Sequence, residues 1–280
     1  MTPTRPVPVD VISIQSQVVY GRVGNNAAIP ALEACGLLAA AVPTTLLSNT
    51  PHYPSVHGGA VPEAWLAGWL DDLEARGIPD RARVVQIGFL GDPAQARILA
   101  SWWSRIHERH PHLRLHLDPV IGDYDHGVYV ADGMAEALTT RLVPAAHGLV
   151  PNRFELEQLT GTRLRGLDDC REAARALLHG AAQWIVVTSV QGDPEGAVVQ
   201  TLLETRDGTS TLFEHPRVPC AVKGVGDYFA ARLTGHLLLG CEVSQAVDRA
   251  CRETTERLDL TRHLGWEELA IHAPGRSAKP

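Results

Sequence analysis

The sequence predicts an α/β fold: a doubly wound, mostly parallel central sheet flanked by helices. Short apolar runs of strand length recur along the chain, and most are separated by stretches in which apolar residues have helical spacing. Several runs stop at polar residues or proline, as strands do at the carboxyl edge of a parallel sheet. The length of 280 residues and 45% hydrophobic content suit one large core. We therefore expect a single domain over residues 1–280, with flexible tails at 1–8 and about 274–280.

The first half of the chain contains three predicted strands, at residues 9–14, 84–89 and 113–117. The second strand follows a stretch whose large apolar residues recur at helical spacing, namely Trp65, Leu66, Trp69, Leu70 and Leu73. Another helix is expected at 94–108. Alternation of strand and helix favours parallel pairing, because each helix carries the chain back across the sheet.

The second half repeats this alternation and then departs from it. Strands are expected at 148–150 and 184–187, and helices at 155–159 and 170–178. Two further apolar runs, at 198–203 and 210–213, flank Asp207-Gly208, a pair typical of hairpin turns. A β-hairpin is therefore predicted beside the parallel strands.

Composition excludes some classes of function. A net charge of −7 and a pI near 6.0 argue against nucleic acid as a partner, since binding phosphates needs clustered lysine and arginine. No apolar run reaches the roughly 18 residues of a membrane span. The residues 1–8 lack the apolar stretch of a signal peptide, and the five cysteines show no metal-type pairing. We expect a cytoplasmic protein with reduced thiols.

The most informative motif is Gly224-Val225-Gly226-Asp227, where a helix is expected to begin. Glycines let the backbone approach a ligand, and the free N–H groups of a first helical turn bind anions. A carboxylate here would repel a phosphate unless it faces a hydroxyl group that attacks the phosphoryl group. The motif therefore indicates a phosphotransferase acting on a small alcohol, with a helix start capped by Asp227 as the alternative.

Polar residues follow several predicted strands and should gather at one edge of the sheet, where open parallel sheets bind ligands. They are Ser16, Asp118, Asp123, Asn152, Glu155, Thr188 and Ser189. Each alone is more typical of a turn or a helix cap. Together they suit phosphoryl transfer, because Asp118, Asp123 and Glu155 offer oxygen ligands for Mg²⁺ and Asn152 can orient a water or a phosphate oxygen. The P-loop class is disfavoured, since no GxxxxGK[ST] motif is present.

The chain resembles the ribokinase-like superfamily, and within it the bacterial pyridoxal/pyridoxine/pyridoxamine kinases. The segments that carry the resemblance span nearly the whole chain: 15–25, 47–53, 118–123, 151–157, 187–189 and 224–227. The first two are specific to the vitamin kinases, whereas the NxxE and GxGD motifs belong to the wider superfamily. The resemblance implies ATP-dependent phosphorylation of the 5′-hydroxymethyl group of B6 vitamers in pyridoxal 5′-phosphate salvage.

The resemblance also implies roles for individual residues. Ser16 would hydrogen-bond the pyridine ring, His52 would lie over the vitamin, and Asp227 would be the catalytic base and contact the substrate. The ATP site would comprise Asp118, Tyr129, Val150, Asn152, Glu155, Thr188, Gly224, Val225 and Gly226. Mg²⁺ would be held by Asp118, Glu155 and the backbone of Tyr129, and a monovalent cation such as K⁺ is compatible with the family. A homodimer is expected on the same ground.

Two positions depart from the family pattern. Val150 stands where relatives often carry threonine near the nucleotide, so one hydroxyl contact is lost. Phe89 stands where tyrosine is frequent, which removes a polar contact to substrate or lid. Neither change removes a group that the chemistry requires.

Two alternative functions remain. Hydroxymethylpyrimidine kinase, of thiamine synthesis, shares the fold and Asp227, but Ser16 and the segment 48–53 favour B6 vitamers. A non-catalytic B6 or nucleotide sensor is disfavoured because Asp227, Glu155 and both glycines are present. The glycine- and proline-rich loop at 48–59 is expected to form a flap over the vitamin.

Other conspicuous residues receive a structural interpretation. The tryptophans Trp65, Trp69, Trp102 and Trp103 are expected to be packing residues. The histidines His107, His110, His112 and His116 lack the spacing of a metal site, so solvent exposure around a strand start is expected.

Overall fold

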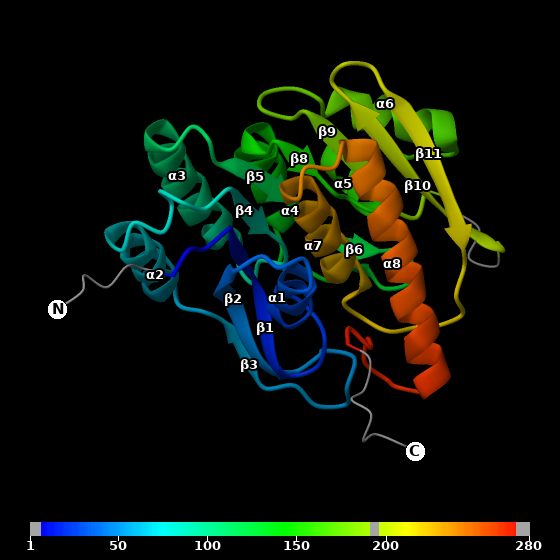
Figure 1. The fold of residues 1–280 in the computed structure, drawn as a ribbon, viewed down its shortest axis with the longest axis horizontal. Coiled ribbons are helices and arrows are strands. Elements are labelled where there is room, and N and C mark those ends of the chain that lie inside the picture. The colour runs from blue at the N-terminus through cyan, green and yellow to red at the C-terminus, as the bar shows by residue number, and fades with distance from the viewer. Residues whose placement is uncertain (1–6, 191–195, 273–280) are drawn as a thin grey trace.

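The computed structural model describes residues 7–190 and 196–272 and contains a nine-stranded sheet in the order β11-β10-β9-β8-β5-β4-β1-β2-β3 (Figure 1). Its strands are β1 (Val11–Tyr20), β2 (Ala39–Asn49), β3 (Gly58–Ala60), β4 (Val84–Ile87), β5 (Arg114–Leu117), β8 (Gly148–Leu149), β9 (Trp184–Val187), β10 (Val198–Thr205) and β11 (Ser210–Pro216). A separate small hairpin joins β6 (Gly122–Asp123) to β7 (Gly127–Val128).

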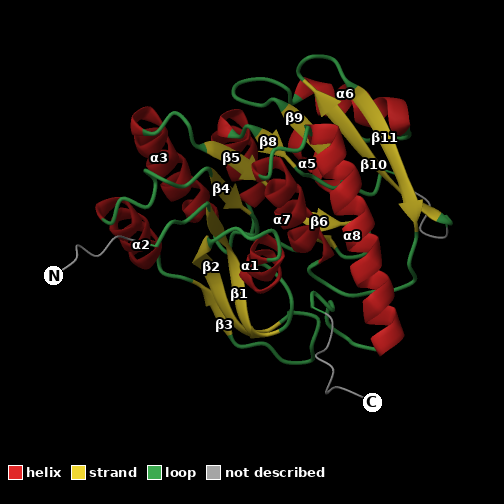
Figure 2. Cartoon of the chain, viewed as in Figure 1, coloured by secondary structure: helices red, strands yellow, loops and turns green. Residues whose placement is uncertain are grey.

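Pairing within the large sheet is mostly parallel. The strands β1, β2, β4, β5, β8 and β9 run in one direction, and antiparallel pairs occur at the two ends, β2–β3 and β9–β10–β11. Helices flank the sheet (Figure 2). The predicted fold class is therefore confirmed.

Eight α-helices alternate with the strands in the described part of the chain. They are α1 (Asn25–Glu33), α2 (Glu63–Ala75), α3 (Pro93–Arg109), α4 (Met134–Ala137), α5 (Arg153–Thr160), α6 (Leu167–Ala176), α7 (Val225–Leu238) and α8 (Val243–Leu264). A π-helical turn (Leu138–Leu142) and a 3₁₀ turn (Val143–Ala145) follow α4. None of the described helices is long and apolar enough to cross a membrane.

The helices form two layers. Alternate strand residues face opposite sides, so Val85 packs into the core under α2 to α6, whereas Val84 packs against α1 and α7. Both faces of the sheet are thus buried, which explains why the central strands read as continuous apolar runs. The α1, α7 and α8 layer is the one that carries the GxGD motif.

Most predicted elements are present, with boundaries shifted by a few residues. The hairpin around Asp207-Gly208 is confirmed, and Gly208 adopts a φ of 92° in its turn. Of the expected tails, residues 1–6 and 273–280 lie outside the described part of the chain, and Val7 and Pro8 are exposed coil. The extent of a single domain over residues 1–280 stays a prediction.

The first strand corrects the prediction. It runs from Val11 to Tyr20, so Ser16 lies within the strand instead of after it. The pairing with β2 changes register between Gln15 and Gln17, and such irregularities redirect side chains near active sites. The alanine-rich strand β2, with Pro43 inside it, and helix α1 gave no clear periodic signal and were not predicted.

Two packing expectations are wrong. Trp65 is 55% exposed, whereas Trp102 and Trp103 are buried as expected. His116 is buried, with Nδ1 2.9 Å from the Thr234 hydroxyl, and burial lowers its pKa to about 3. A histidine on a central strand therefore behaves as a neutral core residue, while His112 is exposed as expected.

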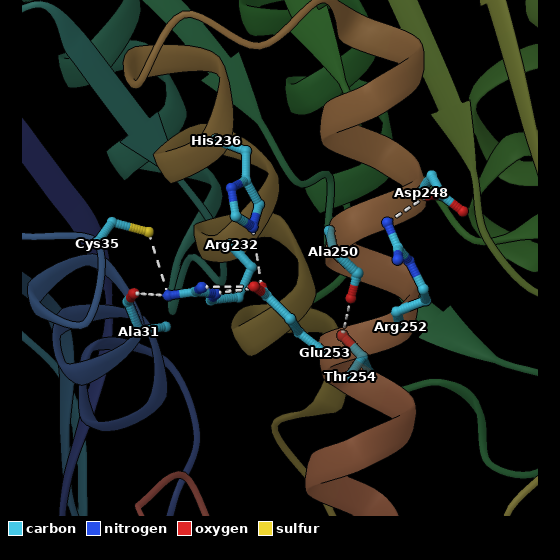
Figure 3. Close-up of polar contacts among 9 residues, drawn as sticks. All are labelled: Ala31, Cys35, Arg232, His236, Asp248, Ala250, Arg252, Glu253 and Thr254. Atoms are coloured by element: carbon cyan, nitrogen blue, oxygen red, sulfur yellow. Dashed lines mark hydrogen bonds and ion pairs between the residues drawn. The ribbon is translucent and has the colours of Figure 1, made fainter.

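A buried ion-pair cluster fixes α7 between α1 and α8 (Figure 3). Arg232 donates hydrogen bonds to both carboxylate oxygens of Glu253, at 2.6 and 2.8 Å, and to the carbonyl of Ala31 at 2.9 Å. The Nε2 atom of His236 lies 2.9 Å from the same carboxylate. Arg232, His236 and Glu253 are called the α7 ion-pair cluster below. It joins three helices through charge-assisted hydrogen bonds, and so sets the position of α7.

Candidate active site

The N-terminus of α7 is built by close backbone approach. Gly224 has a φ of 80°, and a Cβ atom there would lie 1.7 Å from the carbonyl oxygen of Arg22. Only glycine fits, so the turn at residues 21–24 and the start of α7 are in direct contact. At Gly226 a Cβ atom would lie 4.0 Å from Oδ2 of Asp118, which places that carboxylate beside the first helical turn. Free N–H groups at the start of a helix can bind an anion, so this turn is a candidate anion site.

Asp227 is oriented from the same turn. The N–H of Gly24 donates a hydrogen bond of 2.8 Å to Oδ2 of Asp227. A Cβ atom on Gly24 would lie 2.3 Å from Oγ of Ser16, so Ser16 packs closely against this turn. Burial raises the pKa of Asp227, and the Gly24 hydrogen bond opposes the shift. A carboxylate with a raised pKa, open to a cavity, is suited to accept a proton.

A cavity of about 560 Å³ contains all three predicted substrate residues, Ser16, His52 and Asp227. Tyr129 and Phe89 also line it. The His52 side chain comes from the loop between β2 and β3, and its ring lies 4.1 Å from that of Tyr53. The structure therefore brings residues from three distant segments to one small-molecule cavity.

A second cavity, of about 400 Å³, lies on the other side of the GxGD segment. Asn152, Thr188, Val225 and Gly226 line it, whereas Gly224 lines the first cavity. Its remaining wall comes mainly from β10, β11, α7 and α8, through residues such as Thr201, His215, Phe229, Cys251 and Leu258. Two cavities that meet at an anion-binding helix start can hold the two substrates of a phosphoryl transfer.

Two buried carboxylates, Asp118 and Glu155, interact with each other, and Asp118 also with Asp227. Glu155 accepts hydrogen bonds from the N–H groups of Ile121 at 3.0 Å and Asn152 at 2.8 Å, the second within the capping box of α5. Burial raises the pKa of Glu155 to about 7 despite these bonds. Burial, and then the charges of Glu155 and Asp227, raise the pKa of Asp118 well above its usual range. Among the described residues no lysine or arginine forms an ion pair with any of the three.

A cationic side chain that the sequence analysis did not assign lies at the rim of the first cavity. Lys223, one of two lysines in the sequence, extends its Nζ to 3.4 Å from Nε2 of His126. His126 in turn donates its backbone N–H to Oδ1 of Asp123 at 2.7 Å. Burial raises the pKa of Asp123, but the His126 contacts bring it below its ordinary value. Asp123 was predicted as a magnesium ligand. In the structure its carboxylate accepts a hydrogen bond from His126 at the rim of the first cavity.

The predicted nucleotide residues do not all line one cavity. Thr188 and Asn152 line the second cavity, and the Asn152 amide is already engaged: Oδ1 accepts the Glu155 N–H and Nδ2 donates to the Gly122 carbonyl, both at 2.8 Å. Tyr129 lines the first cavity instead. Val150 lines neither cavity and packs in the core with Trp184 and Phe229. The absence of a threonine hydroxyl at this position therefore removes no group from the lining of either cavity.

Several lining residues were missed for identifiable reasons. Lys223 was recognisable from its place before Gly224 and from the scarcity of lysine in an arginine-rich chain. The α8 residues Cys251, Thr254 and Leu258 carry no motif, because they reach the second cavity only through the packing of α8 on the sheet.

The fold and the site define a class. A helix N-terminus with an adjacent carboxylate, set between two cavities at the edge of a mostly parallel sheet, is the arrangement of a small-molecule kinase.

Comparisons with known proteins identify the family. The phosphomethylpyrimidine kinase family matches residues 21–271 of the chain. A pyridoxine/pyridoxal/pyridoxamine kinase of Bordetella bronchiseptica is 52% identical over 273 residues, which cover 97% of this chain and 96% of the relative. A pyridoxal kinase of Deinococcus radiodurans is 34% identical over 288 residues, covering 100% of this chain and 96% of the relative. The chain therefore belongs to the phosphomethylpyrimidine kinase family, as a member of its bacterial B6 kinases.

A solved structure agrees with this assignment. Pyridoxal kinase from Leishmania donovani, in complex with ADP and pyridoxine, superimposes with a TM-score of 0.85 at 26% identity. The match covers 94% of this chain and 92% of that one. The ribokinase-like architecture expected from the sequence is thus confirmed.

Proposed function

We propose that the chain catalyses ATP-dependent phosphorylation of the 5′-hydroxymethyl group of pyridoxal, pyridoxine and pyridoxamine. The observation that carries the proposal is the position of Asp227, which is held by the Gly24 N–H and opens into a cavity that also contains Ser16 and His52. The names of the relatives from Bordetella and Deinococcus support the same activity.

Four side chains that line the first cavity have a role in this proposal. Asp227 accepts the proton of the 5′-hydroxyl, Ser16 hydrogen-bonds the pyridine ring, and His52 covers the vitamin. The free N–H groups at residues 224–226 bind the phosphoryl oxygens on which charge develops. Lys223 adds a positive charge beside the same turn.

ATP occupies the second cavity, with its base and ribose near Thr188 and its phosphates directed at the start of α7. Asp118 and Glu155 suit a hard divalent cation, because they are buried carboxylates without a cationic partner in the described chain. Mg²⁺ is the proposed ion, with Tyr129 contributing through its backbone and K⁺ as a second, monovalent ion. Both Glu155 oxygens already accept N–H groups, which favours contact with the ion through water. The ion supplies charge neutralisation of the transferring group.

The proposal includes a homodimer in the cytoplasm. Val19 is 88% exposed, and Leu46 is exposed on the neighbouring strand β2 and faces the same side of the sheet, so apolar side chains are available for contact with a second copy. The five cysteines are unpaired, which suits a reducing compartment. Light scattering of the purified protein tests the dimer.

A direct assay tests the activity. Purified protein is incubated with MgATP and, separately, pyridoxal, pyridoxine, pyridoxamine and hydroxymethylpyrimidine, while ADP release and the phosphorylated product are measured. Turnover of B6 vitamers well above that of hydroxymethylpyrimidine is expected. Preference for hydroxymethylpyrimidine would assign the chain to thiamine synthesis, and tight binding of pyridoxal without turnover would indicate a sensor.

A further inference from the structure

The segment that follows α8 folds back onto the active-site turn. Within it Glu268 is 8% exposed, and its carboxylate accepts hydrogen bonds from two different loops. Its Oε2 accepts the Arg22 N–H at 2.8 Å, and its Oε1 accepts the Thr50 hydroxyl at 3.0 Å. The carboxylate therefore joins the C-terminal segment to the end of β1 and to the loop after β2.

The Arg22 contact leads to the catalytic carboxylate. Arg22 belongs to the turn at residues 21–24, whose Gly24 N–H donates to Asp227. The Arg22 carbonyl oxygen abuts Gly224, so a shift of this turn would displace the start of α7 as well. Glu268 thus supports both the orientation of Asp227 and the anion site.

The Thr50 contact leads to the vitamin side of the first cavity. Thr50 begins the loop 50–57, called the flap here, which carries His52. The Tyr53 ring lies between the rings of Tyr20, at 5.8 Å, and His52, at 4.1 Å. Burial, and then the adjacent Glu268, raise the pKa of Tyr53, whose buried hydroxyl forms no hydrogen bond within the described part of the chain.

Glu268 is closely packed and has no cationic partner in the described part of the chain. Gly21 has a φ of 129°, and a Cβ atom there would lie 2.0 Å from the Thr50 hydroxyl oxygen and 3.2 Å from Glu268 Oε1. Within the described ranges no lysine, arginine or histidine forms an ion pair with Glu268. A buried carboxylate without hydrogen bonds is costly, so its charge favours the arrangement in which both loops supply their donors.

We propose that Glu268 is a positioning residue, which holds the flap and the turn at 21–24 in the arrangement that binds the vitamin. Its effect on kinetics rests on the proposed function, because the flap covers the vitamin and not the nucleotide. Neither loop contributes a residue to the lining of the second cavity.

The adjacent Glu267 provides a matched control, since it is exposed and, among the described residues, its carboxylate accepts a hydrogen bond from the Tyr20 hydroxyl alone, at 3.3 Å. Glu268→Ala should raise KM for pyridoxal about tenfold to a hundredfold, the effect of leaving buried donors unpaired. KM for ATP should rise less, by no more than about threefold, because Glu268 reaches the anion site only through the turn at 21–24, and Glu267→Ala should leave both values unchanged. Glu268→Gln should recover part of the loss, because its amide oxygen can accept one N–H and its NH₂ can donate to the Thr50 hydroxyl.

A measurement without substrate separates this proposal from the activity. Backbone hydrogen exchange of residues 50–57 should be faster in Glu268→Ala than in the wild type and in Glu267→Ala. A wild type that does not phosphorylate pyridoxal would refute the proposed function, while the exchange rates would still decide the role of Glu268. If Glu268→Ala does not fold, Thr50→Val removes one donor alone and carries both measurements. Unchanged exchange in the flap, or equal rises in KM for pyridoxal and ATP, would overturn the proposal.

Discussion

Helix α7 holds buried charges in two opposite ways. In its middle, Arg232 and His236 meet Glu253, and each charged group has a partner (Figure 3). At its N-terminus, Asp227 lies with Asp118 and Glu155, and this group of carboxylates has no cationic partner in the described chain. Paired charges stabilise a fold, whereas unpaired buried charges destabilise it unless a ligand supplies the missing charge.

The pKa directions express the same difference. Burial raises the pKa of Glu253, but hydrogen bonds from Arg232 and His236 bring it below its ordinary value. In the other group, burial dominates and the pKa of each carboxyl is raised. The first group therefore stabilises the fold, while the second lowers stability at the site proposed for a cation and phosphates.

The largest expected effect is on the chemistry of the unpaired group. Asp227→Asn should lower kcat by about 10²- to 10⁴-fold, because a primary alcohol needs a proton acceptor within hydrogen-bond reach. Asn keeps one acceptor for the Gly24 N–H, so the binding of pyridoxal and ATP should survive. Steady-state kinetics and calorimetric binding of both substrates measure the two effects.

The same variant tests the comparison through stability. Asp227 is half-buried and has no cationic partner among the described residues, so removing its charge should leave the melting temperature of the metal-free protein unchanged or raise it. Wild-type kcat in Asp227→Asn would show that the mechanism is wrong and that the GxGD segment is only a capped helix start.

A substitution in the α7 ion-pair cluster should have the opposite effect, lowering stability more than activity. Arg232→Met leaves Glu253 with the His236 contact alone. Because the Glu253 side chain is 27% exposed, the free energy of unfolding should fall by about 2–3 kcal/mol, less than for a fully buried pair. Denaturant unfolding measures this loss, and kcat of the folded variant should fall far less than in Asp227→Asn.

Arg252→Met is the matched control for this variant. Arg252 pairs with Asp248 on the same α8 helix at 2.6 Å, but both side chains are largely exposed (Figure 3). Exposed pairs contribute about 0–1 kcal/mol, so its loss should be small. Equal losses in the two variants would mean that burial does not distinguish the clusters.

The two groups also differ in how far the sequence predicts them. Asp118, Glu155 and Asp227 each follow a strand or a glycine-rich turn, and strand ends of a parallel sheet converge, so local motifs were sufficient. Arg232 and Glu253 lie on different helices with ordinary charge patterns, and only the crossing of α7 and α8 joins them. Glu268 was not predicted for the same reason, because its hydrogen-bond donors Arg22 and Thr50 lie more than 200 positions away in the sequence.

Glu155 contributes to the protein in two ways, as a hydrogen-bond acceptor and as a negative charge, and one substitution can separate the two. Glu155→Gln removes a charge suited to a divalent ion, so activity should fall and raised Mg²⁺ should restore part of it. The glutamine has one acceptor oxygen for two N–H groups, so one of them loses its hydrogen bond, at a cost of about 1 kcal/mol. The substitution also removes the charge repulsion between Glu155 and Asp118, which offsets this cost. The melting temperature should therefore change little.

Glu157→Gln is the control on the same helix. The Glu157 carboxylate accepts the Leu164 N–H at 2.8 Å and lines neither cavity, so its Mg²⁺ dependence should match that of the wild type. A large drop in melting temperature for Glu155→Gln with unaltered Mg²⁺ dependence would mean that the residue is structural alone.

The smallest expected effect is a dependence of stability on pH in the metal-free protein. The pKa of Glu155 is about 7 in the folded chain against an ordinary value of 4.5, so the folded state binds more protons between these values. The free energy of unfolding should therefore fall as pH rises from 5.5 to 7, with a contribution of up to about 1.4 kcal/mol per pH unit. Glu253 has a lowered pKa, and its contribution is complete above pH 4.5 and lost only below it.

Buried His116 acts in the other direction in part of this range. Its folded pKa of about 3 lies below the ordinary 6.5, so the unfolded chain binds more protons and stability falls as pH drops below 6.5. The wild type and Glu155→Gln share this histidine, so the difference between their unfolding free energies at pH 5.5 and 7 isolates Glu155. That difference should disappear in saturating MgATP, because a bound cation favours the charged carboxylate in the folded state. Equal pH dependence in the two metal-free proteins would show that Glu155 carries no unpaired charge, and the contrast between the two ends of α7 would then rest on Asp118 and Asp227 alone.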